Sequence, residues 1–407
     1  MRKTITIGDL GTIITGKTPP TTNKNYYGDY AVFIKPTDIS EQSKYTYETE
    51  EMYSKLAAEK YESSLIPKGA ICVPCIGTIG TKMTMAPCDC YTNQSINSIV
   101  CNENYDNEYV YYLIKNFLPG LKAYNLGTAS GREYVSKSNF EKIELVAELD
   151  KTIQKRIGVI LSRYDSLIEN YRKQIKLLEE AAQRLYKEWF VDLRFPGHEN
   201  TKMVDGLPEG WERKKINTFV NLQSGYAFKS STFEEEGIYK IVTIKNVKDG
   251  VFDGENTSLI RQIPDKMPKH CRLKTGDILL SLTGNVGRIC MVVGDDYLLN
   301  QRVAKLETRY PAFTYCLFRN NDMFITVNNL ANGAAQQNVS PIRIGELKVL
   351  FANDSIMNQF ENLVGTICNK IINLYAQIRF LAEARDRLLP RLMGGEMDVK
   401  NNIRERK

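Results

Sequence analysis

The sequence predicts a mixed α/β fold, in which two similar α/β domains are separated by an antiparallel coiled coil of two long helices and related by a pseudo-twofold axis. Three observations lead to this prediction. A glycine-punctuated segment occurs twice, about half the chain length apart. Short apolar runs that suit buried strands follow a turn in both copies. Each copy then ends in a long amphipathic helical pattern.

The repeated segment is most visible at its glycines. Gly77 and Gly80 of "IGTIGTKM" recur as Gly284 and Gly287 of "TGNVGRIC", with one constant shift of 207 residues. The flanks also match, at a shift of 208 upstream and 204 downstream, and such small drifts are what loop insertions produce. Two copies are too few for a solenoid, which needs at least three repeats. We therefore expect two equivalent globular domains that arose by duplication.

The repeat and the helical patterns together divide the chain. The expected segments are a first α/β domain at 1–149, a central helix at 150–192, a linker at 193–209, a second α/β domain at 210–352, a C-terminal helix at 353–394 and a tail at 395–407.

The two helical patterns step by four and three residues, from Ile153 and again from Ile356, which predicts a coiled-coil seam. Even a polar interruption repeats, because Gln174 corresponds to Gln377, and a buried polar residue in a seam commonly sets the register. Helices of this length, about 55–60 Å, exceed the diameter of such small domains, so we expect them to pack on each other. The predicted seam residues are Ile157, Tyr164, Tyr171, Gln174, Leu178, Phe360, Ile367, Leu374, Gln377 and Leu381.

Catalytic chemistry is poorly supplied. The chain has 2 histidines, and it lacks a phosphate-binding Walker motif, a dinucleotide fingerprint and the motif of an amino-methyltransferase. Cys72, Cys75, Cys88 and Cys90 have a spacing that could hold zinc. The equivalent positions of the second copy carry two leucines, an aspartate and a tyrosine, so the domain is expected to fold without a metal. We expect no enzyme and no cofactor or metal of its own.

The charge balance permits a polyanionic partner without requiring one. The chain has 54 Lys+Arg against 48 Asp+Glu, a formal charge of +6. The N-terminus lacks the apolar run of a signal peptide, and no segment approaches 18 uninterrupted apolar residues. We expect a cytoplasmic protein with reduced cysteines and no membrane contact.

Glycine-rich polar loops are the candidate DNA-binding regions. Arg grips guanine bidentately and Asn or Gln adenine, whereas Lys, Ser and Thr hold phosphates. The glycines at 77, 80, 284 and 287 match between copies while loop residues differ, as Thr81 and Arg288 do, so the two domains would recognise different sequences. The candidate DNA-binding residues are Lys17, Thr18, Lys35, Thr78, Thr81, Lys82, Arg132, Tyr226, Lys229, Lys245, Asn285, Arg288, Arg302, Gln336, Gln337 and Asn338.

Several motifs resemble the specificity (S) subunit of type I restriction–modification systems. "GTIGT" with "NQS", and "GNVGR" with "NQR", are similar to the core of its recognition domains. "LYKEWFVDLRFPG" at 185–197 and "RDRLLPRLMGGEM" at 385–397 are similar to the ends of its conserved helices, and "LPEGWE" at 207–212 to the start of a recognition domain. The first domain departs from the pattern because it lacks the Leu-Pro-x-Gly-Trp opening.

The resemblance implies a function. Each recognition domain would recognise one half of a bipartite, asymmetric double-stranded DNA target in the major groove. The helices would set the spacer and dock two modification (M) methyltransferase subunits, which carry S-adenosylmethionine and methylate adenine. Restriction (R) subunits would join for ATP-driven cleavage, so both cofactors belong to partner subunits.

Three alternatives stay open from the sequence. The chain could serve an enzyme whose methyltransferase and nuclease share one separate polypeptide. It could instead be a coiled-coil adaptor whose end domains bind proteins, and indifference to DNA in a gel shift would indicate this. It could also be an enzyme with a cryptic active site.

Overall fold

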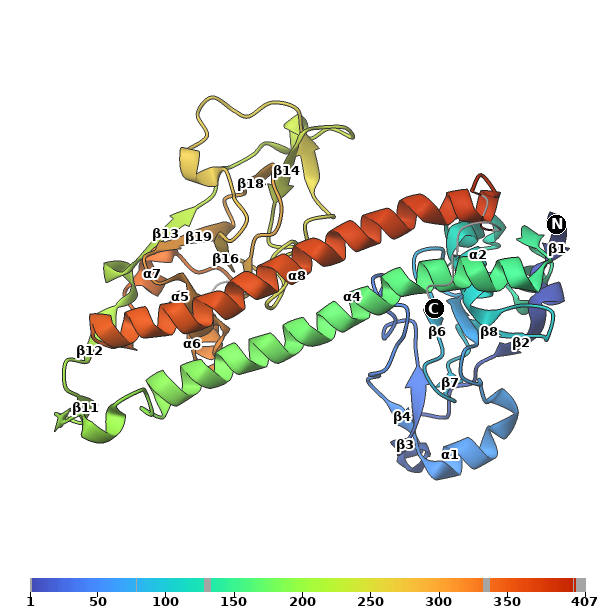
Figure 1. The fold of residues 1–407 in the computed structure, drawn as a ribbon, viewed down its shortest axis with the longest axis horizontal. Helices are drawn as coiled ribbons and strands as arrows, with labels where there is room; N and C mark the ends of the chain where they lie inside the picture. Colours follow the sequence, from blue (N-terminus) through green and yellow to red (C-terminus); the bar gives the residue numbers. More distant parts are fainter. Residues whose placement is uncertain (1, 78, 128–132, 332–336, 398, 400–407) are drawn as a thin grey trace, which may run out of the picture. The chain divides into compact units, whose positions relative to one another are not determined.

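The computed structural model describes residues 2–77, 79–127, 133–331, 337–397 and 399 (Figure 1). The chain divides into two compact units. Unit 1 contains residues 1–170 and 380–407, and unit 2 contains residues 171–379. Helix α4 (Lys151–Tyr186) therefore begins in unit 1 and ends in unit 2, whereas α8 (Asp354–Gly394) begins in unit 2 and ends in unit 1.

Unit 1 contains three sheets and three short α-helices besides the long ones. Strand β1 pairs with β9, a four-stranded antiparallel sheet has the order β2-β8-β5-β6, and a three-stranded sheet has the order β4-β3-β7 with β3 and β7 parallel. The bounds are β1 Arg2–Thr6, β2 Gly11–Thr15, β3 Tyr27–Ile34, β4 Met52–Tyr53, α1 Lys55–Lys60, β5 Ile71–Pro74, β6 Thr84–Met85, β7 Tyr91–Thr92, β8 Ile96–Cys101, α2 Asn107–Phe117, α3 Lys137–Glu141 and β9 Glu144–Glu148.

Unit 2 repeats this topology. Three of its sheets in the described residues are β12-β20, β13-β19-β16-β17 and β15-β14-β18, with β14 and β18 parallel, so every strand from β1 to β9 has a counterpart from β12 to β20 in the same place. The antiparallel pair β10-β11 is additional to this repeat. The bounds are β10 Met203–Val204, β11 Leu207–Pro208, β12 Glu212–Lys215, β13 Val220–Ser224, β14 Tyr239–Val242, β15 Ser258–Ile260, β16 Ile278–Ser281, β17 Ile289–Met291, β18 Tyr297–Leu299, β19 Val303–Thr308, α5 Pro311–Arg319, α6 Asn321–Ala331, α7 Pro341–Gly345 and β20 Lys348–Phe351. The prediction of two similar mixed α/β domains is confirmed.

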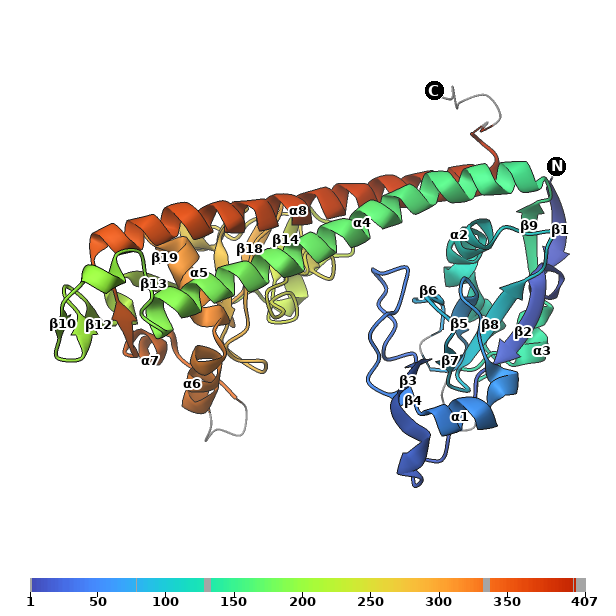
Figure 2. The ribbon, with the colours of Figure 1, turned by 60° about the horizontal axis from the view of Figure 1, so that its bottom comes forward.

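The core of each unit joins a domain to both long helices. In unit 1, Ile99 of β8 and Tyr112 of α2 belong to one buried cluster with Ile157 and Leu161 of α4 and Leu389 of α8. Helix α2 lies between the four-stranded sheet and the long helices of this unit (Figure 2). The start of α4 thus packs with the end of α8, which makes the two helices antiparallel in unit 1.

Unit 2 is closed in the same way by the opposite helix ends. Ala182 and Tyr186 near the end of α4 belong to one buried cluster with Phe360 and Val364 near the start of α8. A π-helical turn at Lys187–Val191 extends α4 and adds further aromatic side chains to this cluster. The sequence predicted helices at 150–192 and 353–394. The structure has α4 at Lys151–Tyr186, extended by the π-helical turn to Val191, and α8 at Asp354–Gly394.

The predicted seam residues are buried to different degrees. Ile157, Phe360 and Leu374 are buried, and after three of the other predicted positions the following residue is the more buried one, namely Asp165, Ile175 and Cys368. Tyr164, Tyr171, Gln174, Leu178, Ile367 and Leu381 are half-buried, and Gln377 is exposed. On α4 the buried residues follow one another at a spacing of four, from Ile157 to Leu161 and then to Asp165. Because Asp165 is charged, the sequence did not identify it as a buried residue of this face.

No helix among the described residues has the length and apolar character needed to cross a membrane.

The two copies cap the helix that follows the central sheet differently. In unit 1, Asp106 caps α2 itself by accepting a hydrogen bond from the Tyr109 amide at 3.1 Å. Helix α5 has no side-chain cap of its own. Glu361 of α8 instead accepts hydrogen bonds from the amides of Ala312 at 3.0 Å and Phe313 at 2.7 Å. Helix α8 therefore supplies to α5 the cap that α2 carries in its own sequence.

We expect the Glu361→Ala variant to lower the free energy of unfolding by about 1–2 kcal/mol, because it leaves two buried amides at the start of α5 without an acceptor. Urea unfolding followed by circular dichroism measures the loss. Asn358→Ala, at an exposed position of the same helix, is the matched control and should change stability little. Equal unfolding midpoints for the two variants would contradict the capping role.

Candidate nucleic-acid interface

Five loop segments of unit 1 meet at one end of its sheets. They are residues 16–18, 34–35, 75–77, 93–95 and 133–135, and together they are called platform 1. Backbone hydrogen bonds join them: the Cys75 amide donates to Ser95 O at 2.7 Å, and the Gly77 amide donates to Glu133 O at 3.0 Å. Because main-chain bonds hold the platform, its exposed side chains can vary without loss of its shape.

Unit 2 builds the same arrangement, platform 2, from residues 225–226, 242–243, 282–284, 300–302 and 337–339. Its two corresponding bonds run from the Leu282 amide to Arg302 O at 3.0 Å and from the Gly284 amide to Gln337 O at 3.1 Å. Five further backbone hydrogen bonds recur at equivalent positions of the two units. In unit 1 they run from Val135 N to Cys75 O, Asn93 N to Ile34 O, Ile96 N to Asn93 O, Gly16 N to Ile96 O and Lys17 N to Thr92 O. Their counterparts in unit 2, in the same order, run from Val339 N to Leu282 O, Asn300 N to Val242 O, Val303 N to Asn300 O, Gly225 N to Val303 O and Tyr226 N to Leu299 O.

Gly16 and Gly225 hold one edge of each platform through close backbone approach. A Cβ atom on Gly16 would lie 2.1 Å from Thr92 O, and one on Gly225 would lie 2.3 Å from Leu299 O. Only glycine permits this contact. The sequence analysis did not single out this pair as structural, although both glycines precede a candidate DNA-binding residue in the repeat.

The four glycines named from the sequence all lie in left-handed turns. Their φ angles are +84° at Gly77, +76° at Gly80, +72° at Gly284 and +85° at Gly287. These values favour glycine at each position. The glycines form the turns between β5 and β6 and between β16 and β17.

The structure brings some of the candidate DNA-binding residues onto the platforms. Lys17 and Thr18 are exposed on platform 1, and Arg302, Gln337 and Asn338 are exposed on platform 2. The half-buried Tyr226 belongs to platform 2, and the exposed Asn285 directly follows it. Thr81, Lys82, Arg288, Lys229 and Lys245 lie on neighbouring turns, and Thr78, Arg132 and Gln336 lie outside the described residues.

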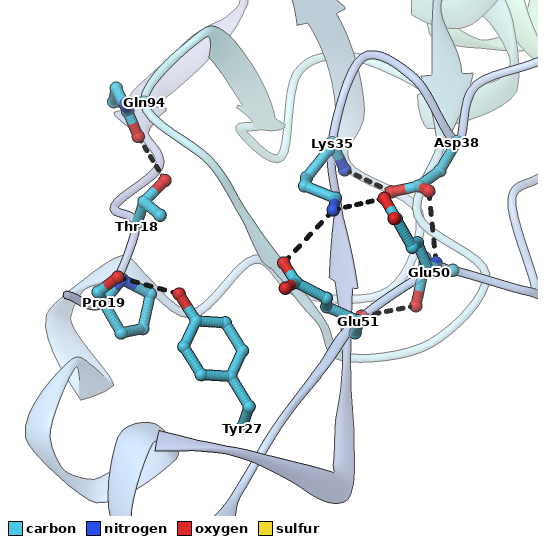
Figure 3. A network of polar contacts seen from close by, with 9 residues as sticks. Thr18, Pro19, Tyr27, Lys35, Asp38, Glu50, Glu51 and Gln94 are labelled. Carbon is cyan, nitrogen blue, oxygen red and sulfur yellow. Dashed lines mark hydrogen bonds and ion pairs between the residues drawn. The ribbon is translucent and has the colours of Figure 1, made fainter. Parts of the chain in front are cut away.

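Lys35 is held by acids rather than presented to a ligand (Figure 3). Its ammonium group contacts Glu50 at 2.7 Å and Glu51 at 3.1 Å, and its side chain is 20% exposed. Burial alone would lower the pKa of Lys35, but the hydrogen bonds to Glu50 and Glu51 outweigh it and raise the pKa. Two carboxylates therefore already balance the charge of Lys35, and its role as a DNA-binding residue stays a prediction.

Platform 1 contains a polar side chain that the sequence analysis left out. Thr18 donates a hydrogen bond to the side chain of Gln94, which is exposed (Figure 3). Its counterpart on platform 2, Gln301, is also exposed. The "NQ" pair of the repeat was a signal that could have identified both glutamines as candidates.

The remaining polar groups offer little reactive chemistry. His198 Nδ1 lies 2.9 Å from Phe195 O, and His270 Nε2 lies 2.9 Å from Ser224 O. Burial raises the pKa of Cys72 to about 11 and that of Cys75 to about 12, so both thiols stay protonated at neutral pH. Within the described ranges, no group of three or more His, Cys, Asp or Glu side chains is arranged to hold a metal ion.

Comparisons with known proteins agree with this two-domain arrangement. A family model described as the type I restriction modification DNA specificity domain matches residues 2–180 and 208–355. The MjaIX specificity subunit of a type I restriction enzyme from Methanocaldococcus jannaschii is 27% identical over 417 residues, which cover 97% of this chain and 93% of that protein. The HindI specificity subunit from Haemophilus influenzae is 36% identical over 174 residues, 41% of this chain and 37% of that protein. The crystal structure of the S subunit of a type I restriction–modification system from M. genitalium shares the fold, with a TM-score of 0.61 and 17% identity over 96% of both chains.

We expect Gly16→Ala and Gly225→Ala each to open one edge of its own platform, because the added methyl group overlaps a carbonyl oxygen. Loss of the hydrogen bond from the following amide should speed hydrogen exchange there by at least about tenfold. Gly365→Ala is the control, since a Cβ at this helical position meets nothing within 4 Å. Unchanged exchange at Lys17 and Tyr226 would show that the close approach is dispensable.

Proposed function

The chain belongs to the type I restriction–modification DNA specificity family, and we propose that each of its platforms recognises one half of a bipartite, asymmetric DNA target. The chain is the non-catalytic specificity subunit of a restriction–modification complex. The observation that carries the proposal is that both platforms keep the same backbone hydrogen bonds while their exposed side chains differ.

The side chains on the platforms suit DNA. On platform 2, Arg302 can grip guanine bidentately, whereas Gln337 and Asn338 can pair with adenine in the major groove. On platform 1, Lys17 and Thr18 can hold phosphates. The two platforms thus offer different donors and acceptors on equal scaffolds, which supports two unlike half-sites.

Partner subunits supply the chemistry in this proposal. Two modification subunits, which carry S-adenosylmethionine and methylate adenine, dock on the long helices, and restriction subunits join for ATP-dependent cleavage. Exposed apolar side chains on the helices support docking there. Leu177 of α4 is 65% exposed and Phe380 of α8 is 58% exposed. These two positions are equivalent in the helical repeat, as expected for two copies of one partner.

The direct test is to sequence methylated adenines in cells that carry this chain with its modification subunits. We expect one bipartite motif with two unlike halves and an unspecified gap. A continuous motif, or no sequence-specific methylation by an active complex, would overturn the proposal.

Arg302→Ala combined with Gln337→Ala should relax one half of this motif and leave the other unchanged. Each lost base contact costs about 1–3 kcal/mol of discrimination. Lys348→Ala, exposed on β20 of the same unit and outside the five segments of platform 2, should leave both halves unchanged. Changes in both half-sites would contradict independent recognition.

Lengthening both long helices should change only the length of the unspecified gap between the two half-sites. Seven residues inserted beside Gln174, with seven more beside Gln377, preserve the buried stripe and add about 10.5 Å. This length corresponds to about three base pairs. We expect the methylated motif to keep both half-sites with a longer gap. Altered half-sites with an unchanged gap would refute the spacer role of the helices.

A further inference from the structure

Two ion pairs join the halves of the repeat. The N-terminal half (residues 1–205) contains the first domain and α4, and the C-terminal half (residues 206–407) contains the second domain and α8. In unit 1, Asp165 of α4 pairs with Arg385 of α8, and they are only 4% and 6% exposed. In unit 2, Glu179 of α4 lies 3.7 Å from Arg319 of α5. Both carboxylates come from the N-terminal half and both arginines from the C-terminal half.

The hydroxyl groups of two tyrosines complete these pairs. Tyr112 donates to Asp165, and Tyr315 donates to Glu179 at 2.6 Å. Burial alone would raise the pKa of Asp165, but Arg385 and weaker partners outweigh it and lower the pKa. Arg385 of the other half is thus the largest of the partners that favour the ionised Asp165 carboxylate, and Lys115 and Tyr112 of the same half add to it.

Among the equivalent positions of the opposite halves, only the counterpart of Arg319 carries a matching charge. Asp165 corresponds to Cys368 and Arg385 corresponds to Ala182, since the two long helices are related by a shift of 203 residues. Unit 2 places this cysteine and this alanine in one apolar cluster. By the same shift Glu179 corresponds to Ala382, and Arg319 corresponds to Lys115, because α5 and α2 begin 204 residues apart.

These differences matter because the halves share one fold. Either half could in principle pair with the same half of a second copy of the chain, and two copies would then exchange halves. Pairing of two N-terminal halves would set Asp165 against Ala182, whereas Glu179 would face the cation Lys115. Pairing of two C-terminal halves would set Arg385 against Cys368 and leave it only the largely exposed Asp386 as a partner. Arg319 would keep its ion pair with Asp249 of its own half. A buried charge that loses its partner is strongly unfavourable, whereas the paired arrangement is tolerated.

We propose that the buried Asp165–Arg385 pair makes the interface selective for the opposite half, so that the chain closes on itself and excludes exchange with a second copy. The Asp165 carboxylate of the N-terminal half and the Arg385 guanidinium of the C-terminal half are the selective groups, and the Glu179–Arg319 contact adds to the interface without deciding the partner. The repeated domains can then keep a common backbone without exchanging partners.

The test makes the two interfaces alike by giving each position the residue of its counterpart. The double variant Asp165→Cys with Arg385→Ala removes one pair, and adding Glu179→Ala with Arg319→Lys removes the other. Wild-type and variant chains are unfolded in urea, refolded at a series of concentrations, and examined by light scattering after size-exclusion chromatography. Two differently tagged chains refolded together report exchange by copurification.

We expect monomers for the wild type, and a dimer fraction at least tenfold higher for the double variant, with the quadruple variant at least as high. Arg385→Lys, which keeps the charge, should stay monomeric. Circular dichroism identifies a quadruple variant that fails to fold, in which case the double variant decides. Equal dimer fractions in wild type and variants, or monomers throughout, would overturn the proposal.

Discussion

The structure depends on one constraint, which is that neither domain closes its core with its own half of the chain alone. The core of unit 1 contains Ile157 and Leu161 from the helix that follows its own domain, and also Leu389 and Met393 from the far end of the other helix. The core of unit 2 shows the same division, with Phe360 from its own helix and Ala182 from the other. Burial of apolar side chains is the main favourable term in folding. Each half therefore stabilises the domain of the other, and the helices have to run antiparallel for both cores to be complete.

The platforms, which we propose recognise DNA, are anchored in this core by Cys75 and Val135 in unit 1 and by Leu282 and Val339 in unit 2. Main-chain hydrogen bonds and the close approach of Gly16 and Gly225 set the shape of each platform, so that shape does not depend on which side chains are exposed. Loops on a rigid scaffold are the usual place for binding residues, because substitutions there cost little stability. The exchange of Ser95 for Arg302 at equivalent positions illustrates how a duplicated domain can acquire a second specificity.

The sequence was most informative where the repeat constrained it. The shift between Gly77 and Gly284 predicted two like domains, and the strand orders match throughout. Periodicity placed the long helices but not their buried faces, because Asp165 and Arg385 are charged and gain a partner only in the folded chain. The acidic partners of Lys35 could not be predicted for a related reason, since Glu50 and Glu51 approach it only through tertiary structure. Charge and spacing alone do not distinguish an exposed lysine from one that acids already hold.

Native-state hydrogen exchange tests the shared core most directly. The amides of Leu389, near the end of α8, and of Ile99, in the centre of β8, lie in different halves of the repeat but in one buried cluster. If that cluster is a single cooperative unit, the two amides should exchange with the same free energy of opening and respond alike to urea. Exchange of Leu389 through an opening several kcal/mol less costly than that of Ile99 would show that the helix end is not part of the core, and would contradict the account.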